Sequence, residues 1–354
     1  MTRIAAVHPV LPRHQYSQSE ITERFADFCL PTSDKQALLR RLHASAAVTT
    51  RHLALPLDQY PLLKDFGAAN DAFIEVAEEL GAQAILGALD EAGLRPHDVD
   101  LVISTTVTGA AVPSIEARIA TKIGMRPDIR RIPLFGLGCV AGASGLARLH
   151  DFLRGAPESV GVLLSVELCS LTVQRDDPST ANMVASGLFG DGAAAVVAVG
   201  DAHPGARTAT GPEIVDSVAH LYPDSGRAMG WDIGASGLKI VLGVEVPDLV
   251  STYLGDDVDQ FLKQHDLSTD DIAGWVTHPG GPRVLQAMQQ SLDLPTEALE
   301  LTWRSLTTVG NLSSASVLHV LRDTLDHRRP TSGSPGLLLA MGPGFCSELV
   351  LLRW

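Results

Sequence analysis

Residues 94–104 read LRPHDVDLVIS, and residues 267–277 repeat that pattern in outline as LSTDDIAGWVT. In both stretches a turn with acidic residues precedes a short strand that contains β-branched residues. The two stretches lie 173 positions apart (267 − 94 = 173), and Gly138 and Asn311 have the same separation (311 − 138 = 173). Two distant segments that share one offset predict two similar halves in one chain. Chance similarity is the alternative, because amphipathic α/β units resemble one another.

Both predicted halves contain the same order of segments, which is a helix that begins with small residues, an apolar strand and a second apolar run. These segments are residues 139–150, 161–166 and 193–199, and residues 312–321, 336–341 and 348–352. Such alternation of helices and strands is typical of parallel or mixed sheets. We therefore predict an α/β fold made of two duplicated halves that pack against each other, residues 1–205 and 206–354.

The composition describes a globular protein with a large core. The 354 residues are 45% hydrophobic and 19% charged, and no linker rich in Pro, Gly or Ser separates independent domains. The net charge of −14 opposes nonspecific binding to nucleic acid or to anionic membranes. The sequence shows neither a leader segment at its start nor an apolar run long enough to span a bilayer. We expect a cytoplasmic protein with no nucleic-acid partner and no integral membrane contact.

Cysteines and clustered cations are the next candidates for chemistry. The four cysteines lack Cys-x-x-Cys spacing, so we expect neither a zinc site nor a disulfide framework, and we expect a catalytic role for any reactive cysteine. An anionic substrate would need a local basic patch. The candidates for that patch are Lys35, Arg40, Arg41 and Arg51. A run of solvated helix charges is the simpler explanation for them.

Cys139 lies in PLFGLGCVAGASG (residues 133–145), where apolar residues lead into a glycine-flanked turn and a helix of small residues. A cysteine at a helix N-terminus has its thiolate favoured by the dipole and by unpaired backbone N–H groups, which lowers its pKa. The same N–H groups stabilise an oxyanion on a bound thioester. The alternative is a buried, inert cysteine.

His278 lies in WVTHPGGP (residues 275–282), at the end of a predicted strand and before a turn that no helix enters immediately. That position exposes an imidazole at the carboxyl edge of a sheet, where α/β sites form. A neutral histidine beside Cys139 accepts its proton and then, as an imidazolium, holds the thiolate charged. The alternative is a loop histidine with an internal hydrogen-bond partner.

Asn311 lies in TVGNLSSAS (residues 308–316), and its simplest role is the N-cap of the following helix. Its carboxamide donor is also suited to stabilising an enolate oxygen without supplying a proton. The predicted duplication places Asn311 at the helix start equivalent to that of Cys139, with His278 just after a strand. We therefore expect the three side chains to converge near a pseudo-twofold axis.

Five motifs follow one another along the chain. They are LGC (137–139) with its helix, GLFGDGA (187–193), HPGGP (278–282), GNLSSA (310–315) and GPG (342–344). Together they resemble the chalcone synthase-like, or type III, polyketide synthases over nearly the whole chain. The stretch VELCSL (166–171) is similar to bacterial members, and the sequence as a whole looks closest to actinobacterial synthases that make long-chain alkylpyrones.

The resemblance implies a homodimer of thiolase-like subunits with five αβαβα layers. It implies acyl-CoA starters and malonyl-type CoA extenders, with no carrier protein, no metal and no cofactor beyond the CoA thioester substrates. By the same resemblance Cys139 is the acylated nucleophile. His278 and Asn311 hold the malonyl thioester carbonyl during decarboxylation, and Phe189 is a gatekeeper beside them.

The chain also departs from the family pattern. Arg41 and Arg51 fall where members place basic residues near the CoA tunnel, but Ser45 stands where many plant members have a further lysine. Ile240 replaces a second gatekeeper phenylalanine, and the loss of that aromatic wall favours a flexible aliphatic starter. The remaining positions expected to shape or flank the pocket are Val107, Thr108, Cys169, Thr172 and Gly344.

These features predict a type III polyketide synthase that condenses a long-chain fatty acyl-CoA with malonyl-CoA or methylmalonyl-CoA and lactonises the product to an alkyl α-pyrone. One alternative is a ketoacyl synthase of the fatty-acid initiating type, whose usual His-Gln-Ala-Asn segment is replaced here by HPGGP (278–282). Another alternative is a noncatalytic thiolase-fold partner that only binds acyl-CoA. Retention of all three reactive residues argues against that second alternative.

Overall fold

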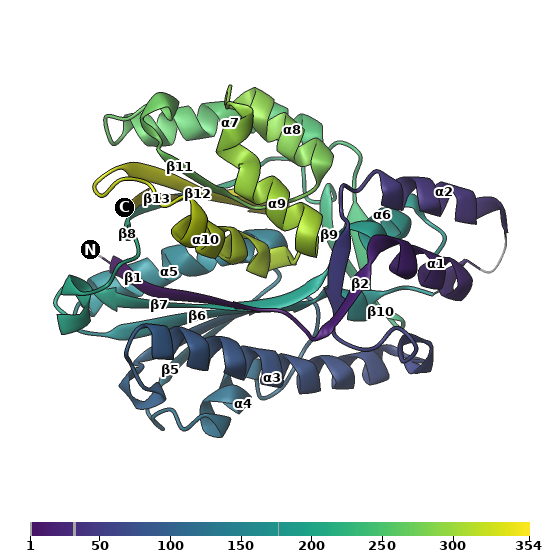
Figure 1. The fold of residues 1–354 in the computed structure, drawn as a ribbon, viewed down its shortest axis with the longest axis horizontal. Helices are drawn as coiled ribbons and strands as arrows, with labels where there is room; N and C mark the ends of the chain where they lie inside the picture. The colour runs from purple at the N-terminus through teal and green to yellow at the C-terminus, as the bar shows by residue number, and fades with distance from the viewer. Residues whose placement is uncertain (1, 31–32, 176) are drawn as a thin grey trace.

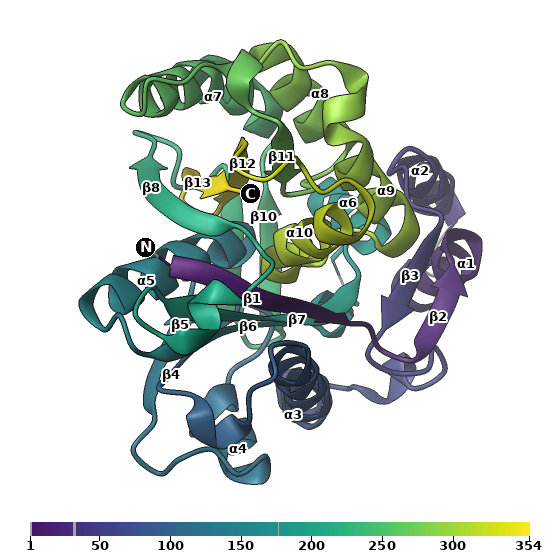
Figure 2. The same ribbon diagram turned by 60° about the vertical axis from the view of Figure 1, so that its left-hand side comes forward.

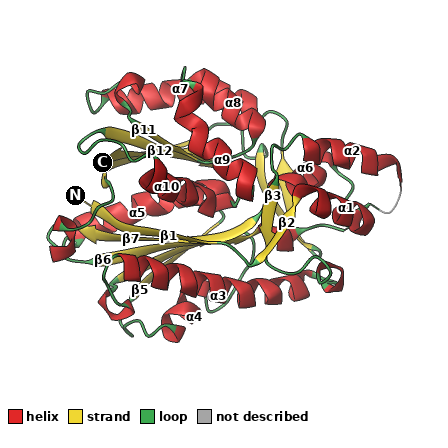
Figure 3. Cartoon of the chain, in the orientation of Figure 1, coloured by secondary structure: helices red, strands yellow, loops and turns green. Residues whose placement is uncertain are grey.

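The computed structural model describes residues 2–30, 33–175 and 177–354, and these form five layers in which helices alternate with sheet (Figures 1 and 3). Helices cover both outer faces, and two further helices fill the space between the two parts of the sheet. The predicted αβαβα fold is therefore confirmed.

The first part of the sheet has the strand order β5-β4-β6-β7-β1, and α3 and α4 cover its outer face (Figure 1). These elements are β1 (Thr2–Val10), α3 (Phe66–Glu91), β4 (Leu101–Thr106), α4 (Ile115–Lys122), β5 (Arg130–Phe135), β6 (Val160–Leu168) and β7 (Asp191–Gly200). Every residue of β6 and β7 is buried. Helices can pack on both faces of β7 because six of its ten residues are alanine or glycine.

The second part of the sheet has the order β11-β12-β13-β8, and its outer face is covered mainly by α7 and α8. These elements are β8 (Glu213–Leu221), α7 (Val246–Lys263), β11 (Gly274–Thr277), α8 (Pro282–Ser291), β12 (Pro335–Gly342) and β13 (Cys346–Arg353). Among the described residues, the two parts join through two residue pairs of β1 and β8, Thr2 with Ile214 and Arg3 with Glu213 (Figure 2). An ion pair of 2.6 Å between the Arg3 and Glu213 side chains strengthens that joint.

The middle layer consists of α5 (Ala141–Gly155) and α10 (Ser316–His327), which contact both parts of the sheet. The two helices approach closely at Gly142, where an added Cβ would lie 2.3 Å from the Ser314 carbonyl oxygen and 2.7 Å from Val317 Cγ1. A side chain at position 142 would push the two helices apart. This contact holds the starts of both helices together, and the reactive residues lie at those starts.

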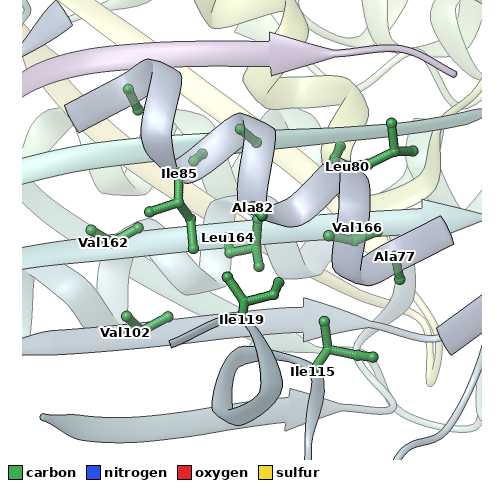
Figure 4. Packing of buried hydrophobic residues seen from close by; sticks show 14 of the residues in the cluster. Ala77, Leu80, Ala82, Ile85, Val102, Ile115, Ile119, Val162, Leu164 and Val166 are labelled. Carbon is green, nitrogen blue, oxygen red and sulfur yellow. The ribbon is translucent and has the colours of Figure 1, made fainter. Parts of the chain in front are cut away.

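The core beneath α3 shows why the outer layer stays in place. Ala77, Leu80 and Ile85 of α3 face Val162 and Leu164 of β6, and small side chains on the helix let it lie close to the sheet (Figure 4). Burying a leucine or isoleucine side chain contributes about 1.5–3 kcal/mol. This layer is therefore a rigid support for the strand ends.

Most of the remaining elements form a separate end of the molecule, at the right in Figure 1. They are β2 (His14–Ser17), α1 (Gln18–Cys29), α2 (Ser33–Ala44), β3 (Thr50–Leu53), α6 (Thr180–Leu188), β9 (Met229–Gly234) and β10 (Gly237–Leu242). The helix α9 (Glu300–Val309) lies nearer the centre and contacts α10 and β3. The strands here make two small sheets, β2 with β3 and β9 with β10. This end lies over the edge of the central sheet where β6 ends and β7 begins.

The repeated stretches of sequence have the same structure in both halves. A 3₁₀ turn at Pro96–Asp98 precedes β4, and another at Thr269–Asp271 precedes β11, with one offset for the turns (269 − 96 = 173) and for the strands (274 − 101 = 173). Each predicted small-residue helix begins as a 3₁₀ turn, Gly138–Val140 before α5 and Ser313–Ala315 before α10. The division at residues 205 and 206 stays a prediction.

Within the described part of the chain, no helix combines the length and the apolar character that a membrane crossing requires.

Candidate active site

Cys139 lies in the 3₁₀ turn that leads into α5, where two loops approach closely. Gly138 has a φ of +54°, and a Cβ on it would lie 2.7 Å from Pro343. A Cβ on Gly342 would lie 2.6 Å from the Leu137 carbonyl oxygen. Glycine is required at both positions, and the GPG segment (342–344) thereby packs directly against the cysteine turn.

The Cys139 thiol is buried, and this changes the expectation about its acidity. Its Sγ lies 3.7 Å from Ser313 Oγ, and the residue is 7% exposed. Burial raises the pKa of the Cys139 thiol to about 12, and the charge of Glu167 raises it further, whereas hydrogen bonds from Ser313 and Asn311 lower it. The helix N-terminus was expected to lower this pKa, but desolvation outweighs it in the folded chain. The resting group is a thiol that needs a base.

His278 follows β11 directly, and its role as that base stays a prediction. Its backbone N–H donates to the Leu339 carbonyl oxygen at 3.0 Å, which extends the pairing of β11 with β12 by one residue. Burial lowers the pKa of His278 to about 3, so the imidazole is neutral at physiological pH. Among the described residues, neither ring nitrogen has a hydrogen-bond partner. One acceptor and one donor nitrogen are therefore available to an incoming group.

Asn311 caps a turn and also contacts Cys139, and its role toward an enolate oxygen stays a prediction. Its Oδ1 accepts a hydrogen bond from the Ser313 backbone N–H at 2.8 Å, which caps the 3₁₀ turn before α10. That bond leaves the Nδ2 group to donate, and the side chain forms a hydrogen bond with Cys139. Backbone bonds of 2.9 Å to Leu188 and from Gly190 anchor the residue. The cap therefore orients the donor toward the sulfur.

Phe189 is held beside Asn311 by the backbone. The two residues form an isolated parallel bridge, and Phe189 follows directly on the end of α6. The Phe189 carbonyl oxygen accepts a hydrogen bond of 2.8 Å from Arg51 Nη1. A gatekeeper position next to the reactive residues matches this geometry.

A cavity of about 70 Å³ lies among α1, α6 and β10, and its lining includes Phe189 but none of Cys139, His278 and Asn311. Four of the predicted pocket residues line it, namely Phe189, Ile240, Cys169 and Thr172. Thr108 lines a neighbouring cavity of about 230 Å³ that shares Thr172 with the first. The predicted residues that line neither cavity are Val107, which is buried, and Gly344, which has a φ of +90° in the loop before β13.

Glu167, near the end of β6, is a buried charged residue beside Cys139 that the sequence argument missed. Its carboxylate accepts hydrogen bonds from Thr108 Oγ1 at 2.9 Å, Ser313 Oγ at 3.2 Å and Ser314 Oγ at 2.6 Å. Burial raises the pKa of Glu167. A single glutamate in the otherwise apolar strand VGVLLSVEL (160–168) was the available signal, since such residues are rarely buried without partners.

The predicted basic patch does not assemble as one surface. Arg40 forms an ion pair of 2.7 Å with Glu23, and Lys35 Nζ donates to the Pro178 carbonyl oxygen at 3.2 Å. Arg41 is exposed near the end of α2. Arg51 is only 2% exposed and donates to backbone oxygens inside the protein, so it is not part of an exposed basic patch, and its predicted place in the substrate tunnel stays a prediction.

The chain is similar to known proteins over its whole length. The N-terminal domain of chalcone and stilbene synthases matches residues 1–203, and their C-terminal domain matches residues 213–354. The chain is 57% identical over 353 residues to a 1,3,6,8-tetrahydroxynaphthalene synthase of Streptomyces peucetius subsp. caesius, covering 100% of this chain and 93% of that protein.

Two further similarities point the same way. A 1,3,6,8-tetrahydroxynaphthalene synthase of Streptomyces coelicolor is 31% identical over 317 residues, covering 90% of this chain and 83% of the relative. The crystal structure of 1,3,6,8-tetrahydroxynaphthalene synthase from Streptomyces coelicolor superimposes with a TM-score of 0.93 at 29% identity and covers 99% of each chain. That structure is described as a bacterial type III polyketide synthase.

Proposed function

The chain belongs to the chalcone and stilbene synthases and is a type III polyketide synthase, and from this membership we propose that it builds 1,3,6,8-tetrahydroxynaphthalene from malonyl-CoA. The observation that carries the proposal is the 57% identity, over the full chain, to an enzyme of that name. The ten-carbon skeleton of this product corresponds to five two-carbon units. Malonyl-CoA supplies one such unit each time it loses carbon dioxide.

We propose that Cys139 and His278 carry out the loading step. One ring nitrogen of neutral His278 accepts the thiol proton as sulfur attacks the thioester carbonyl of the starter. The C–S bond to CoA breaks, and the leaving CoA thiolate takes that proton back from the imidazolium. The first transfer creates an imidazolium beside a thiolate, so each charge is partnered within the buried site although burial disfavours both charges separately.

Chain extension assigns a second role to His278 and the main role to Asn311. The N–H groups of the two side chains donate to the thioester carbonyl oxygen of malonyl-CoA, which becomes an enolate oxygen when carbon dioxide leaves. The enolate carbon attacks the thioester carbonyl on Cys139, a C–C bond forms, and the C–S bond to Cys139 breaks. Transfer of the extended chain from CoA back to Cys139 allows the next cycle.

Two rival functions have less support. A ketoacyl synthase of the fatty-acid initiating type would need a carrier protein, and the family match over residues 1–203 and 213–354 favours a synthase that works on CoA thioesters. A noncatalytic binding partner would have no need for the hydrogen bonds that position Asn311 and Ser313 around Cys139.

A long-chain alkylpyrone remains the second candidate product. It is favoured by Ile240, which is 8% exposed and supplies an aliphatic wall to the cavity where the plant enzymes have a phenylalanine. Against it stands the 57% identity, over 353 residues, to a protein named 1,3,6,8-tetrahydroxynaphthalene synthase.

A homodimer is part of the proposal. β5 is the edge strand of the sheet, with Ile132 39% exposed and Phe135 55% exposed on it. An edge strand with exposed apolar side chains is a template for pairing with a second copy. Light scattering on the purified protein tests this, and a monomeric mass at micromolar concentration would exclude the dimer.

The product assay compares malonyl-CoA alone with malonyl-CoA plus an equimolar long-chain acyl-CoA, each without carrier protein. We expect a tetrahydroxynaphthalene mass from malonyl-CoA alone and little change when the acyl-CoA is added. A dominant alkyl α-pyrone in the mixture would establish the second candidate instead. Decarboxylation only with carrier-bound malonyl groups would support the ketoacyl synthase.

A further inference from the structure

Arg51 has one side of its guanidinium group committed and the other side without a partner. Nη1 donates to the carbonyl oxygens of Ser186 at 2.7 Å and Phe189 at 2.8 Å, and Nε donates to Gln18 Oε1 at 3.0 Å. Nη2 is buried and, among the described residues, has no hydrogen-bond partner. A buried donor on a charged group without an acceptor is costly, because it has lost water and gained nothing in return.

The charge of Arg51 is also incompletely balanced. Burial lowers the pKa of Arg51 to about 10, so the side chain remains a cation at neutral pH. Asp191 is the carboxylate that acts on it electrostatically, but the Asp191 oxygens are used by the Ser170 N–H at 2.8 Å, the Ala54 N–H at 2.6 Å and the Ser170 hydroxyl. No carboxylate of the described chain forms an ion pair with Arg51.

The cavity among α1, α6 and β10 is the place where Arg51 can meet a ligand. Arg51 lines this cavity together with Phe189, which is paired with Asn311, and Cys169, whose pKa is raised by burial and in part by Cys139. Tyr60 and Ser170 line it as well, and their hydroxyls are hydrogen-bonded to each other at 2.5 Å. A chain attached to Cys139 that extends into this cavity therefore passes a largely apolar lining that contains one buried cation.

We propose that Arg51 is a specificity-determining residue whose Nη2 group binds an oxygen atom at the distal end of the chain on Cys139. This inference rests on the proposed function, since it concerns the chain that the synthase builds. The shared chemistry is an oxygen acceptor, supplied either by the terminal carboxylate of a malonyl-derived starter or by a β-keto oxygen. An alkyl end supplies neither and would leave the buried cation unpaired.

Length-matched thioesters separate these cases. Hexanoyl-CoA ends in a methyl group, adipyl-CoA in a carboxylate, and 5-oxohexanoyl-CoA in a methyl ketone. Each is offered in equimolar competition to the wild-type protein, and the acyl adducts on Cys139 are measured by intact-protein mass spectrometry. We expect the two oxygenated chains to acylate Cys139 about tenfold or more in excess of hexanoyl, because a hydrogen bond to a charged group is lost with the alkyl chain.

The variants assign the preference to Arg51. Arg51→Met should reduce the ratio of oxygenated to hexanoyl adducts about tenfold or more, whereas Arg24→Met, which removes an exposed cation from the same cavity, should leave the ratio unchanged. A ratio that persists in Arg51→Met overturns the assignment.

The comparison of the three thioesters on the wild-type protein does not depend on how a variant folds. This matters because Arg51→Met also loses the hydrogen bonds to Ser186 and Phe189. Equal acylation by all three thioesters in the wild-type protein overturns the inference whatever the variants do. Preference for adipyl alone identifies the carboxylate as the acceptor, and preference for both oxygenated chains includes the ketone. If none of the three acylates Cys139, malonyl-CoA is offered alone: loading from malonyl-CoA then overturns the inference about Arg51 but keeps the proposed function, whereas no loading from malonyl-CoA overturns the proposed function as well.

Discussion

Replacing Asn311 separates its structural role from its chemical one, because the two roles use different atoms of one side chain. Oδ1 caps the turn at the Ser313 N–H with a bond of 2.8 Å, and the Nδ2 group remains as the donor toward Cys139 and the substrate carbonyl. Asn311→Ala removes both atoms. Asn311→Asp keeps an acceptor for Ser313 and removes the donor.

The two losses have different magnitudes. Loss of one preorganised donor to an enolate-like oxygen costs about 100- to 1000-fold in rate, or about 2.7–4 kcal/mol. Loss of a cap costs about 0.5–2 kcal/mol of folding stability. We therefore expect Asn311→Ala to lose decarboxylation at least about 100-fold with a reduced melting temperature. Asn311→Asp should lose decarboxylation to a similar extent with a smaller change in melting temperature.

Two assays read these effects independently. Conversion of malonyl-CoA to acetyl-CoA, followed by chromatography, measures decarboxylation, and intact-protein mass spectrometry measures loading on Cys139. Loading in Asn311→Ala should fall by about fivefold or less, because it loses one ordinary hydrogen bond to the sulfur. The reasoning is refuted if Asn311→Asp decarboxylates at the wild-type rate, or if loading falls as far as decarboxylation does.

Three further predictions use the same structure. Burial lowers the pKa of His278 to about 3, so the neutral base form persists as pH falls and is lost only near that value. The loading rate of Cys139 should therefore show no inflection around pH 6.5, the ordinary pKa of histidine. A clear inflection at that pH in a rapid-quench loading assay would contradict the buried imidazole. Gly142→Ala should destabilise the protein by about 1–3 kcal/mol in thermal unfolding, because the added Cβ would lie 2.3 Å from a carbonyl oxygen. Gly155→Ala, at the end of the same helix, should not destabilise it, because nothing lies within 4 Å of the added Cβ. Equal melting temperatures for the two variants would show that α5 and α10 are not tightly packed at Gly142. Ile240→Trp should shorten the products, since it fills the cavity beside Phe189, and an unchanged product profile by mass spectrometry would place the growing chain elsewhere.

The repeated turn and strand, with one offset of 173 residues, were enough to predict two similar α/β halves, whereas the five layers were predicted from the family resemblance. This worked because the signal is local. A 3₁₀ turn before β4 and β11, and a strand end before His278, are encoded by short stretches of adjacent residues. The roles of Asn311 were also local, since its cap involves a residue only two positions away.

Arg51 and Glu167 show where such reasoning stops. The partners of Arg51 lie 135 and 138 residues away, and the Ser313 and Ser314 partners of Glu167 lie 146 and 147 residues away. Whether a charged side chain faces solvent or the interior depends on which distant backbone groups arrive beside it. The prediction of a lowered pKa for Cys139 was wrong for the same reason, because burial by the whole fold outweighed the effect of the local helix start.

The most direct test of the central claim is to locate the growing chain during turnover. The protein is mixed with malonyl-CoA alone, quenched during steady turnover, digested, and analysed by mass spectrometry for acyl and polyketide adducts. The account predicts adducts on the peptide that contains Cys139, and it predicts that both the adducts and the released naphthalene disappear in Cys139→Ala. Product formation that persists in Cys139→Ala, or adducts carried by Cys169 instead, would contradict it.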